Sequence, residues 1–170
     1  MTRALWLVLA IVIACSACRT DAPAPASAPP RVSAEPSSPR PTAVVLTKAQ
    51  AADRYLRIVR PYNAALKRFQ TEAHAGRSWV RLRTLADRIG TANTTQIKAL
   101  RATPWPTNAR ERAAALIAVS TRAGRFWDAA ATATTSDRFR SAVLRAARLS
   151  GKSEATALRR ALGLQPNSRP

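Results

Sequence analysis

Two cysteines, Cys15 and Cys18, lie three residues apart at the end of an apolar run near the start of the chain. This spacing has three interpretations: a redox-active pair, a pair of metal ligands, or the attachment point of a covalently bound group. Haem attachment through Cys-x-x-Cys needs a following histidine, and Arg19 occupies that position. Redox activity needs a folded, electropositive surrounding in a strand–helix context, which the flanking sequence does not predict. The sequence therefore favours attachment over redox chemistry, and two buried thiols without a further role are the alternative.

The apolar run is typical of an export signal. Arg3 supplies a positive charge, and residues 4–14 are apolar without interruption. This run is shorter than the roughly 20 residues that span a bilayer. Val12-Ile13-Ala14-Cys15, or less typically Cys15-Ser16-Ala17-Cys18, resembles a bacterial lipobox, in which the cysteine is thioether-linked to diacylglycerol. We therefore expect residues 1–18 to be a lipoprotein signal peptide with its lipidation site. Cys15 is preferred over Cys18 because Val12 fits the aliphatic position.

Residues 19–42 are rich in Pro, Ala and Ser and predict a disordered linker. Such a composition cannot bury enough apolar surface to fold, and proline favours extended polyproline II backbone. We expect the last residues, 165–170, to form a disordered tail.

The remaining residues, 43–164, predict an all-α domain. Apolar residues recur there at steps of three and four, which is typical of helices with one buried face. The predicted helices cover 47–74, 78–103, 107–134 and 136–162, and the last is either continuous or broken at Gly151. Because very short turns force each helix back along the previous one, we expect an antiparallel up-down four-helix bundle.

Several residues mark the predicted helix ends and contacts. Thr47 and Gln50 can form a capping box, Thr107 can cap the third helix, and Gly163 can end the last. The small residues Ser120 and Gly124 lie one turn apart, so a neighbouring backbone can approach them closely. Trp105, between two prolines, either covers the end of the bundle or is an exposed contact point.

Taken together, the lipobox-like cysteine, the Pro-rich linker and the stretches LTKAQAADRYLRIVRPYNAAL, ATPWP and LRRALGLQP resemble small predicted lipoproteins of actinobacteria. The resemblance covers nearly the whole chain, but all of its motifs are structural or topogenic. It implies a helical domain anchored on the extracytoplasmic face of the cell membrane, of uncharacterised role. It implies no catalytic residues.

Side chains suited to catalysis or metal binding are scattered in the helical region. There is one histidine, His74, and there are seven acids: Asp53, Glu72, Asp87, Glu111, Asp128, Asp137 and Glu154. The sequence lacks the paired Glu-x-x-His motifs of a di-iron bundle, the Gly-x-Ser-x-Gly motif and a glycine-rich phosphate loop. We therefore expect a non-enzymatic protein without a cofactor or metal site. The alternative is an envelope enzyme, hydrolase-like, whose unrecognised site involves His74 or Asp128.

Basic residues are the repeated polar feature. The chain has 28 Lys and Arg against 9 Asp and Glu, which gives a formal net charge of +19. Such an excess favours anionic partners, although abundant Arg and Ala are also typical of a GC-rich genome. On the predicted first helix, one outer side carries Arg54, Arg57, Arg60, Lys67 and Arg68, and Arg77, Arg81 and Arg88 follow along the second helix.

A solvated helix face and an anion-binding face both explain these residues. From the second explanation we expect a lipid-anchored module that binds an anionic lipid or wall polymer, or an envelope protein. Nucleic acid is not expected as a partner, because the chain is expected to be exported. The sequence leaves the oligomeric state open.

Overall fold

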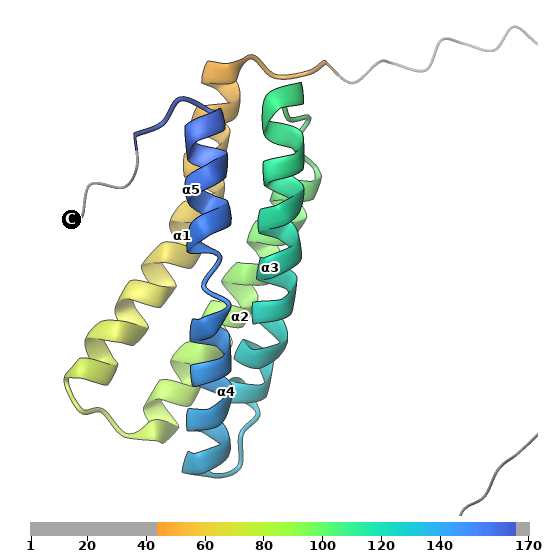
Figure 1. The fold of residues 1–170 in the computed structure, drawn as a ribbon. Helices are drawn as coiled ribbons and strands as arrows, with labels where there is room; N and C mark the ends of the chain where they lie inside the picture. The colour runs from red at the N-terminus through yellow and green to blue at the C-terminus, as the bar shows by residue number, and fades with distance from the viewer. Residues whose placement is uncertain (1–43, 166–170) are drawn as a thin grey trace, which may run out of the picture. The chain divides into compact units, whose positions relative to one another are not determined.

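The computed structural model describes residues 44–165, which form five α-helices and the turns between them (Figure 1). In chain order these are α1 (Lys48–His74), α2 (Trp79–Arg101), α3 (Thr107–Ala131), α4 (Ser136–Arg148) and α5 (Lys152–Ala161). α2 packs against α1 and α3, while α4 and α5 follow one another along α3 and together take the place of a fourth helix. The predicted all-α class and helical bundle are confirmed, and the described residues include no strand.

The predicted signal peptide, both cysteines and the linker lie outside the described residues. So do most of the predicted C-terminal tail residues.

Three of the four predicted helix starts depend on side-chain caps. The Thr47 hydroxyl accepts a hydrogen bond from the Gln50 backbone N–H at 3.3 Å, and the Gln50 side chain accepts one from the Thr47 N–H at 3.0 Å. This is the predicted capping box. The predicted cap at Thr107 is wrong: Pro106 occupies the N-cap position of α3 without a side-chain hydrogen bond, and Thr107 is the first helical residue. Proline suits this position because its ring fixes φ and it needs no N–H partner there.

The last predicted helix is broken at Gly151. This residue has φ +64°, in the left-handed region that glycine enters without a steric cost. A Cβ at this position would also lie 3.0 Å from Cγ1 of Val119 on α3. The break therefore allows the chain to pass close to α3 between α4 and α5. Gly163 has φ +74° and follows the end of α5, as predicted.

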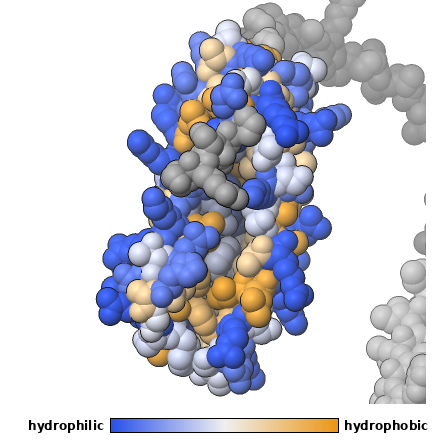
Figure 2. Space-filling view, turned by 60° about the vertical axis from the view of Figure 1, so that its left-hand side comes forward, coloured by the Kyte–Doolittle hydropathy of each residue, from blue (hydrophilic) through white to orange (hydrophobic). Residues whose placement is uncertain are grey.

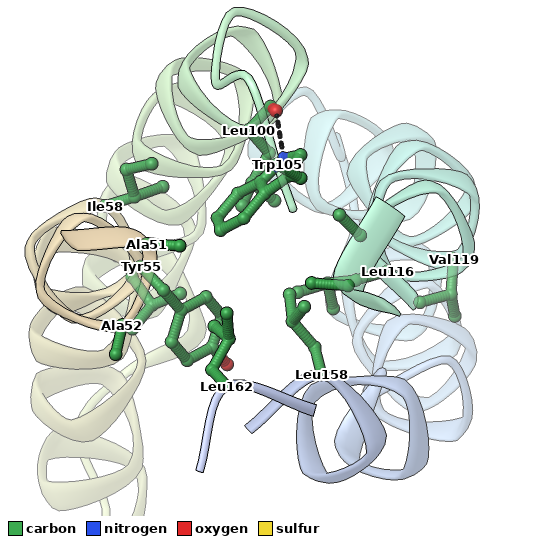
Figure 3. Packing of buried hydrophobic residues seen from close by; sticks show 13 residues of the cluster. Ala51, Ala52, Tyr55, Ile58, Leu100, Trp105, Leu116, Val119, Leu158 and Leu162 are labelled. Carbon is green, nitrogen blue, oxygen red and sulfur yellow. Dashed lines mark hydrogen bonds between the residues drawn. The ribbon is translucent and has the colours of Figure 1, made fainter. Parts of the chain in front are cut away.

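The buried residues form two clusters along the bundle. One surrounds Trp105 and includes Tyr55 from α1, Leu116 from α3 and Leu158 from α5 (Figure 3). The indole N–H of Trp105 donates a hydrogen bond of 2.8 Å to the Leu100 carbonyl, and only 5% of the residue is exposed. Trp105 is thus part of the core, which excludes the alternative of an exposed contact point.

The second cluster surrounds Phe69, Trp127 and Phe139. Phe69 and Trp127 meet edge to face, with ring centroids 5.5 Å apart. Four residues on the predicted apolar stripes of the first and last helices are instead exposed: Ala49, Leu56, Leu144 and Ala147. On α4 the buried stripe consists of Phe139, Ala142 and Ala146, and Leu144 lies to one side of it with 54% of its surface exposed.

Candidate functional site

The basic residues predicted on α1 share one exposed face. Arg54, Arg57, Arg60, Lys67 and Arg68 are all exposed. They lie on the side of the helix opposite its buried stripe, which contains Tyr55, Ile58 and Val59. None of the five forms a salt bridge with another described residue. We call these five residues the α1 basic face.

The basic residues predicted on the second helix have different surroundings. Arg81 donates hydrogen bonds to the Glu72 carboxylate from Nε at 2.7 Å and from Nη2 at 3.3 Å. Arg77 lies in the turn before α2 and not on that helix as predicted, and its guanidinium is 3.5 Å from the same carboxylate. The hydrogen bond from Arg81 is the main cause that lowers the pKa of Glu72. The positive charges of the surrounding arginines lower this pKa further. Arg77 and Arg81 therefore join the ends of α1 and α2 across their turn, whereas Arg88 is exposed without a salt bridge to a described residue.

Exposed basic residues also occur on the other helices. α3, α4 and α5 expose Arg110, Arg112, Arg122, Arg125, Arg138, Arg140, Arg145, Arg148, Lys152 and Arg160. Arg145 is held over the ring of Phe126, with its guanidinium carbon 5.9 Å from the ring centroid. Positive charge thus covers more of the bundle than the predicted set. The sequence carried this signal, because these residues also recur on the polar sides of their helices.

The groups considered for catalysis are separated in the structure. His74 is exposed at the end of α1, and Asp128 is exposed on α3. Neither residue lines the cavity described below. In the range 44–165, no group of three or more His, Cys, Asp and Glu side chains is placed to hold a metal ion.

A cavity of about 410 Å³ lies between the middle of α1, α2, α3 and the segment that joins α4 to α5. Its apolar wall comes from three helices and from the α4–α5 segment: Val59, Leu66, Leu116, Ala123, Leu149 and Ala155. The polar residues include Tyr55, Tyr62, Gln96 and Ser120, and the two charged residues in the lining, Lys152 and Arg159, are both basic. On the molecular face shown in Figure 2, hydrophobic residues gather in the lower half between hydrophilic margins.

Two tyrosines, Tyr55 and Tyr62, line the cavity. Burial raises the pKa of Tyr55, and the positive charge of Arg159 lowers it in part. Burial also raises the pKa of Tyr62, and the indole N–H of Trp127 opposes that effect. The geometry between this indole N–H and Tyr62 is not that of a regular hydrogen bond, and Trp127 Nε1 is buried without a hydrogen-bond acceptor among the described residues. Both phenols therefore stay protonated at neutral pH and can donate hydrogen bonds.

Gln96 is a buried polar residue of the cavity lining that the sequence reasoning missed. Only 4% of it is exposed, and its amide oxygen has no hydrogen-bond donor among the described residues. Asn93, one turn earlier on α2, is equally buried but donates a hydrogen bond of 2.9 Å from Nδ2 to the Ser120 carbonyl. The sequence did contain a signal for this burial: Asn93 and Gln96 lie on the same side of the predicted helix as the apolar residues Ile89 and Leu100.

Comparisons of this chain with protein-family models, curated protein sequences and solved structures found no match in any of the three. The resemblance to actinobacterial lipoproteins therefore stays a prediction from the sequence. None of the described helices combines the length and apolar character that a membrane span requires.

Proposed function

We propose that this chain is a lipid-anchored protein on the extracytoplasmic face of the cell membrane. In this proposal its helical domain binds an anionic lipid or wall polymer through the α1 basic face. The observation that carries the proposal is the α1 basic face itself: five exposed basic side chains opposite the core, without a salt bridge to any described residue. The anchor is proposed from the sequence alone, at Cys15 or else at Cys18.

Electrostatics makes this face suited to a membrane or a polyanion. Each basic side chain near an anionic headgroup layer contributes about 1 kcal/mol, and salt weakens the attraction within a Debye length. A lipid anchor would keep the domain near such a surface, so that modest attraction suffices for lasting contact. We infer a binding module rather than an enzyme because the exposed charges are overwhelmingly basic and the exposed acids occur singly.

Vesicle binding tests the proposal. The full-length chain, produced without lipid modification, is sedimented with vesicles of phosphatidylglycerol and phosphatidylcholine or of phosphatidylcholine alone. A parallel arm adds a soluble polyanion, polyglutamate, which distinguishes a polymer from a lipid headgroup as the source of the negative charge. We expect preferential binding to the anionic vesicles or the polymer, and a decline as salt rises.

Matched charge variants test whether α1 is the binding face. Arg54→Gln, Arg57→Gln and Arg60→Gln together remove three charges from α1, and Arg110→Gln, Arg112→Gln and Arg122→Gln remove three from α3. At about 1 kcal/mol per charge, the α1 variant should bind roughly 100-fold more weakly, and the α3 variant should bind much like the unchanged chain. Equal losses for both variants, or equal weak binding to charged and neutral vesicles, would contradict a role for the α1 basic face.

A further inference from the structure

At the break at Gly151 the bundle has a cavity beside α1 that is partly open to solvent. A continuous fourth helix would keep its helical path past Gly151. In the structure the helix is interrupted there, and Gly151 adopts the left-handed conformation. Leu149 and Lys152, on either side of the break, both line the cavity. The volume of about 410 Å³ falls within the range of small-molecule sites, which span roughly 300–1,000 Å³.

Gln96 provides a second, independent observation that points to a ligand. A buried amide oxygen without a hydrogen-bond donor loses its contacts with water and gains nothing in return, so native proteins retain few of them without a reason. This oxygen belongs to Gln96, which lines the cavity and has only 4% of its surface exposed. A molecule seated in the cavity with an N–H or O–H group can supply the missing donor.

The charges of the lining indicate what else such a molecule carries. Lys152 and Arg159 both line the cavity, and none of the described residues that line it is acidic. Arg159 lies near enough to Tyr55 to affect its hydroxyl, which places positive charge beside the buried part of the wall. The same lining includes apolar side chains of α1 and α3, among them Val59 and Leu116. An apolar body with an acidic group would therefore find both apolar and basic side chains in this lining.

We propose that this cavity binds a small molecule that combines an apolar body, a hydrogen-bond donor for Gln96 and an acidic group for Arg159 and Lys152. The site is separate from the α1 basic face, whose five residues do not line the cavity. Failure of vesicle binding would therefore leave this proposal standing, and the reverse also holds.

Three dansyl probes separate the contributions to binding. Dansylglycine has a naphthalene ring, a sulfonamide N–H and a carboxylate. Dansylsarcosine keeps the carboxylate but has a methyl group in place of that N–H, and dansylamide lacks the carboxylate. Dansyl fluorescence rises and shifts to the blue when the ring leaves water, so titration of the full-length chain into each probe reports its transfer to an apolar site. We expect dansylglycine to bind at least tenfold more tightly than either of the other probes.

Variants with matched controls locate the binding. Arg159→Gln should weaken dansylglycine binding about tenfold, as expected for a lost hydrogen bond to a charged group, whereas Arg160→Gln on the next residue should change it less than twofold. Gln96→Leu should abolish the preference for dansylglycine over dansylsarcosine. Ala155→Phe places a ring in the cavity lining and should prevent binding, whereas Ala157→Phe, also on α5 but outside the lining, should not.

Circular dichroism verifies that each variant remains helical, and Arg159→Gln on the protein surface keeps the test decisive if a core variant fails to fold. The proposal would be overturned if no probe shows enhanced fluorescence. It would also be overturned if Arg159→Gln and Arg160→Gln bind dansylglycine equally well, or if the three probes bind with the same affinity, because binding would then lie outside this cavity.

Discussion

The side-chain amide of Asn93 on α2 donates a hydrogen bond of 2.9 Å to the backbone carbonyl of Ser120 on α3. Gly124, one turn further along α3, leaves the space that this amide occupies: a Cβ there would lie 2.7 Å from Nδ2 of Asn93. The close approach predicted at Ser120 and Gly124 is therefore made by a buried side chain of α2. Two α-helices are thus joined by a buried polar contact.

Gly124→Ala should destabilise the protein by about 1 kcal/mol. The added methyl group displaces the Asn93 amide and breaks its hydrogen bond, which outweighs the gain of about 1 kcal/mol in helix propensity. In an Asn93→Ala background the same change should become stabilising, because the Asn93 amide no longer occupies the space that the added methyl group needs. Urea unfolding of the four proteins in this cycle measures both effects. Destabilisation of the same size in both backgrounds would contradict the coupling between these residues.

Gly90 on α2 is the matched control for this prediction. A Cβ there would lie 2.9 Å from Oδ1 of Asp128, which is the end of an exposed side chain that can move into solvent. Gly90→Ala should therefore be neutral or stabilising by up to about 1 kcal/mol.

Helix positions were predictable because local chemistry marks their ends. The capping box of Thr47 and Gln50 uses residues within one turn of each other, and the left-handed Gly163 follows directly from the freedom of glycine. The cap of α3 was mispredicted because Thr107 and Pro106 are both compatible with a helix start, and only the path of the chain from Trp105 selects between them. Leu144 was mispredicted because its stripe was chosen from the larger apolar side chains, whereas the buried stripe of α4 consists of Phe139 and the small residues Ala142 and Ala146.

Gln96→Leu should raise the stability of the protein. The substitution removes a buried amide oxygen that lacks a donor among the described residues and adds apolar contact, so we expect an increase of about 1 kcal/mol and a rise of about 3 °C in the Tm. Asn93→Leu, one turn away, should have the opposite effect, because it removes the hydrogen bond to Ser120. Thermal unfolding followed by circular dichroism compares the three proteins. A Gln96→Leu protein less stable than the unchanged chain would show that the amide has a structural partner.

Glu72 should make the stability of the α1–α2 turn depend on pH. Arg81 and Arg77 hold the pKa of the folded-state carboxyl below its usual value of 4.5. The stabilisation is therefore fully present above pH 4.5 and is lost as the pH falls through the lowered pKa of the folded state. In Glu72→Gln the ion pairs are absent at every pH.

Thermal unfolding of both proteins between pH 7 and pH 3 tests this prediction. The unchanged chain should be the more stable at pH 7, and the difference in Tm should shrink towards pH 3. Glu111→Gln, an exposed acid on α3 without a salt bridge to a described residue, is the control. A constant difference across the whole range would show that the carboxylate charge contributes nothing.

The two candidate sites differ in how far the sequence predicts them. The α1 basic face follows from helical spacing, because residues three and four apart share one side of a helix. The involvement of Arg77 and Arg81 with Glu72 depends on the α1–α2 turn, which brings two helix ends together. The cavity beside Gln96 depends on four separate segments and on the Gly151 break, so a helix pattern alone does not reveal it.

Lipid attachment underlies the proposed function, because it would keep the α1 basic face close to the membrane. The most direct measurement is labelling of bacteria that express the full-length chain with an alkyne fatty acid, followed by mass spectrometry of its N-terminal peptide. We predict a labelled chain that begins at acylated Cys15, and loss of the label in Cys15→Ser but not in Cys18→Ser. An unlabelled chain in which neither Cys15 nor Cys18 carries lipid would contradict the proposed membrane attachment.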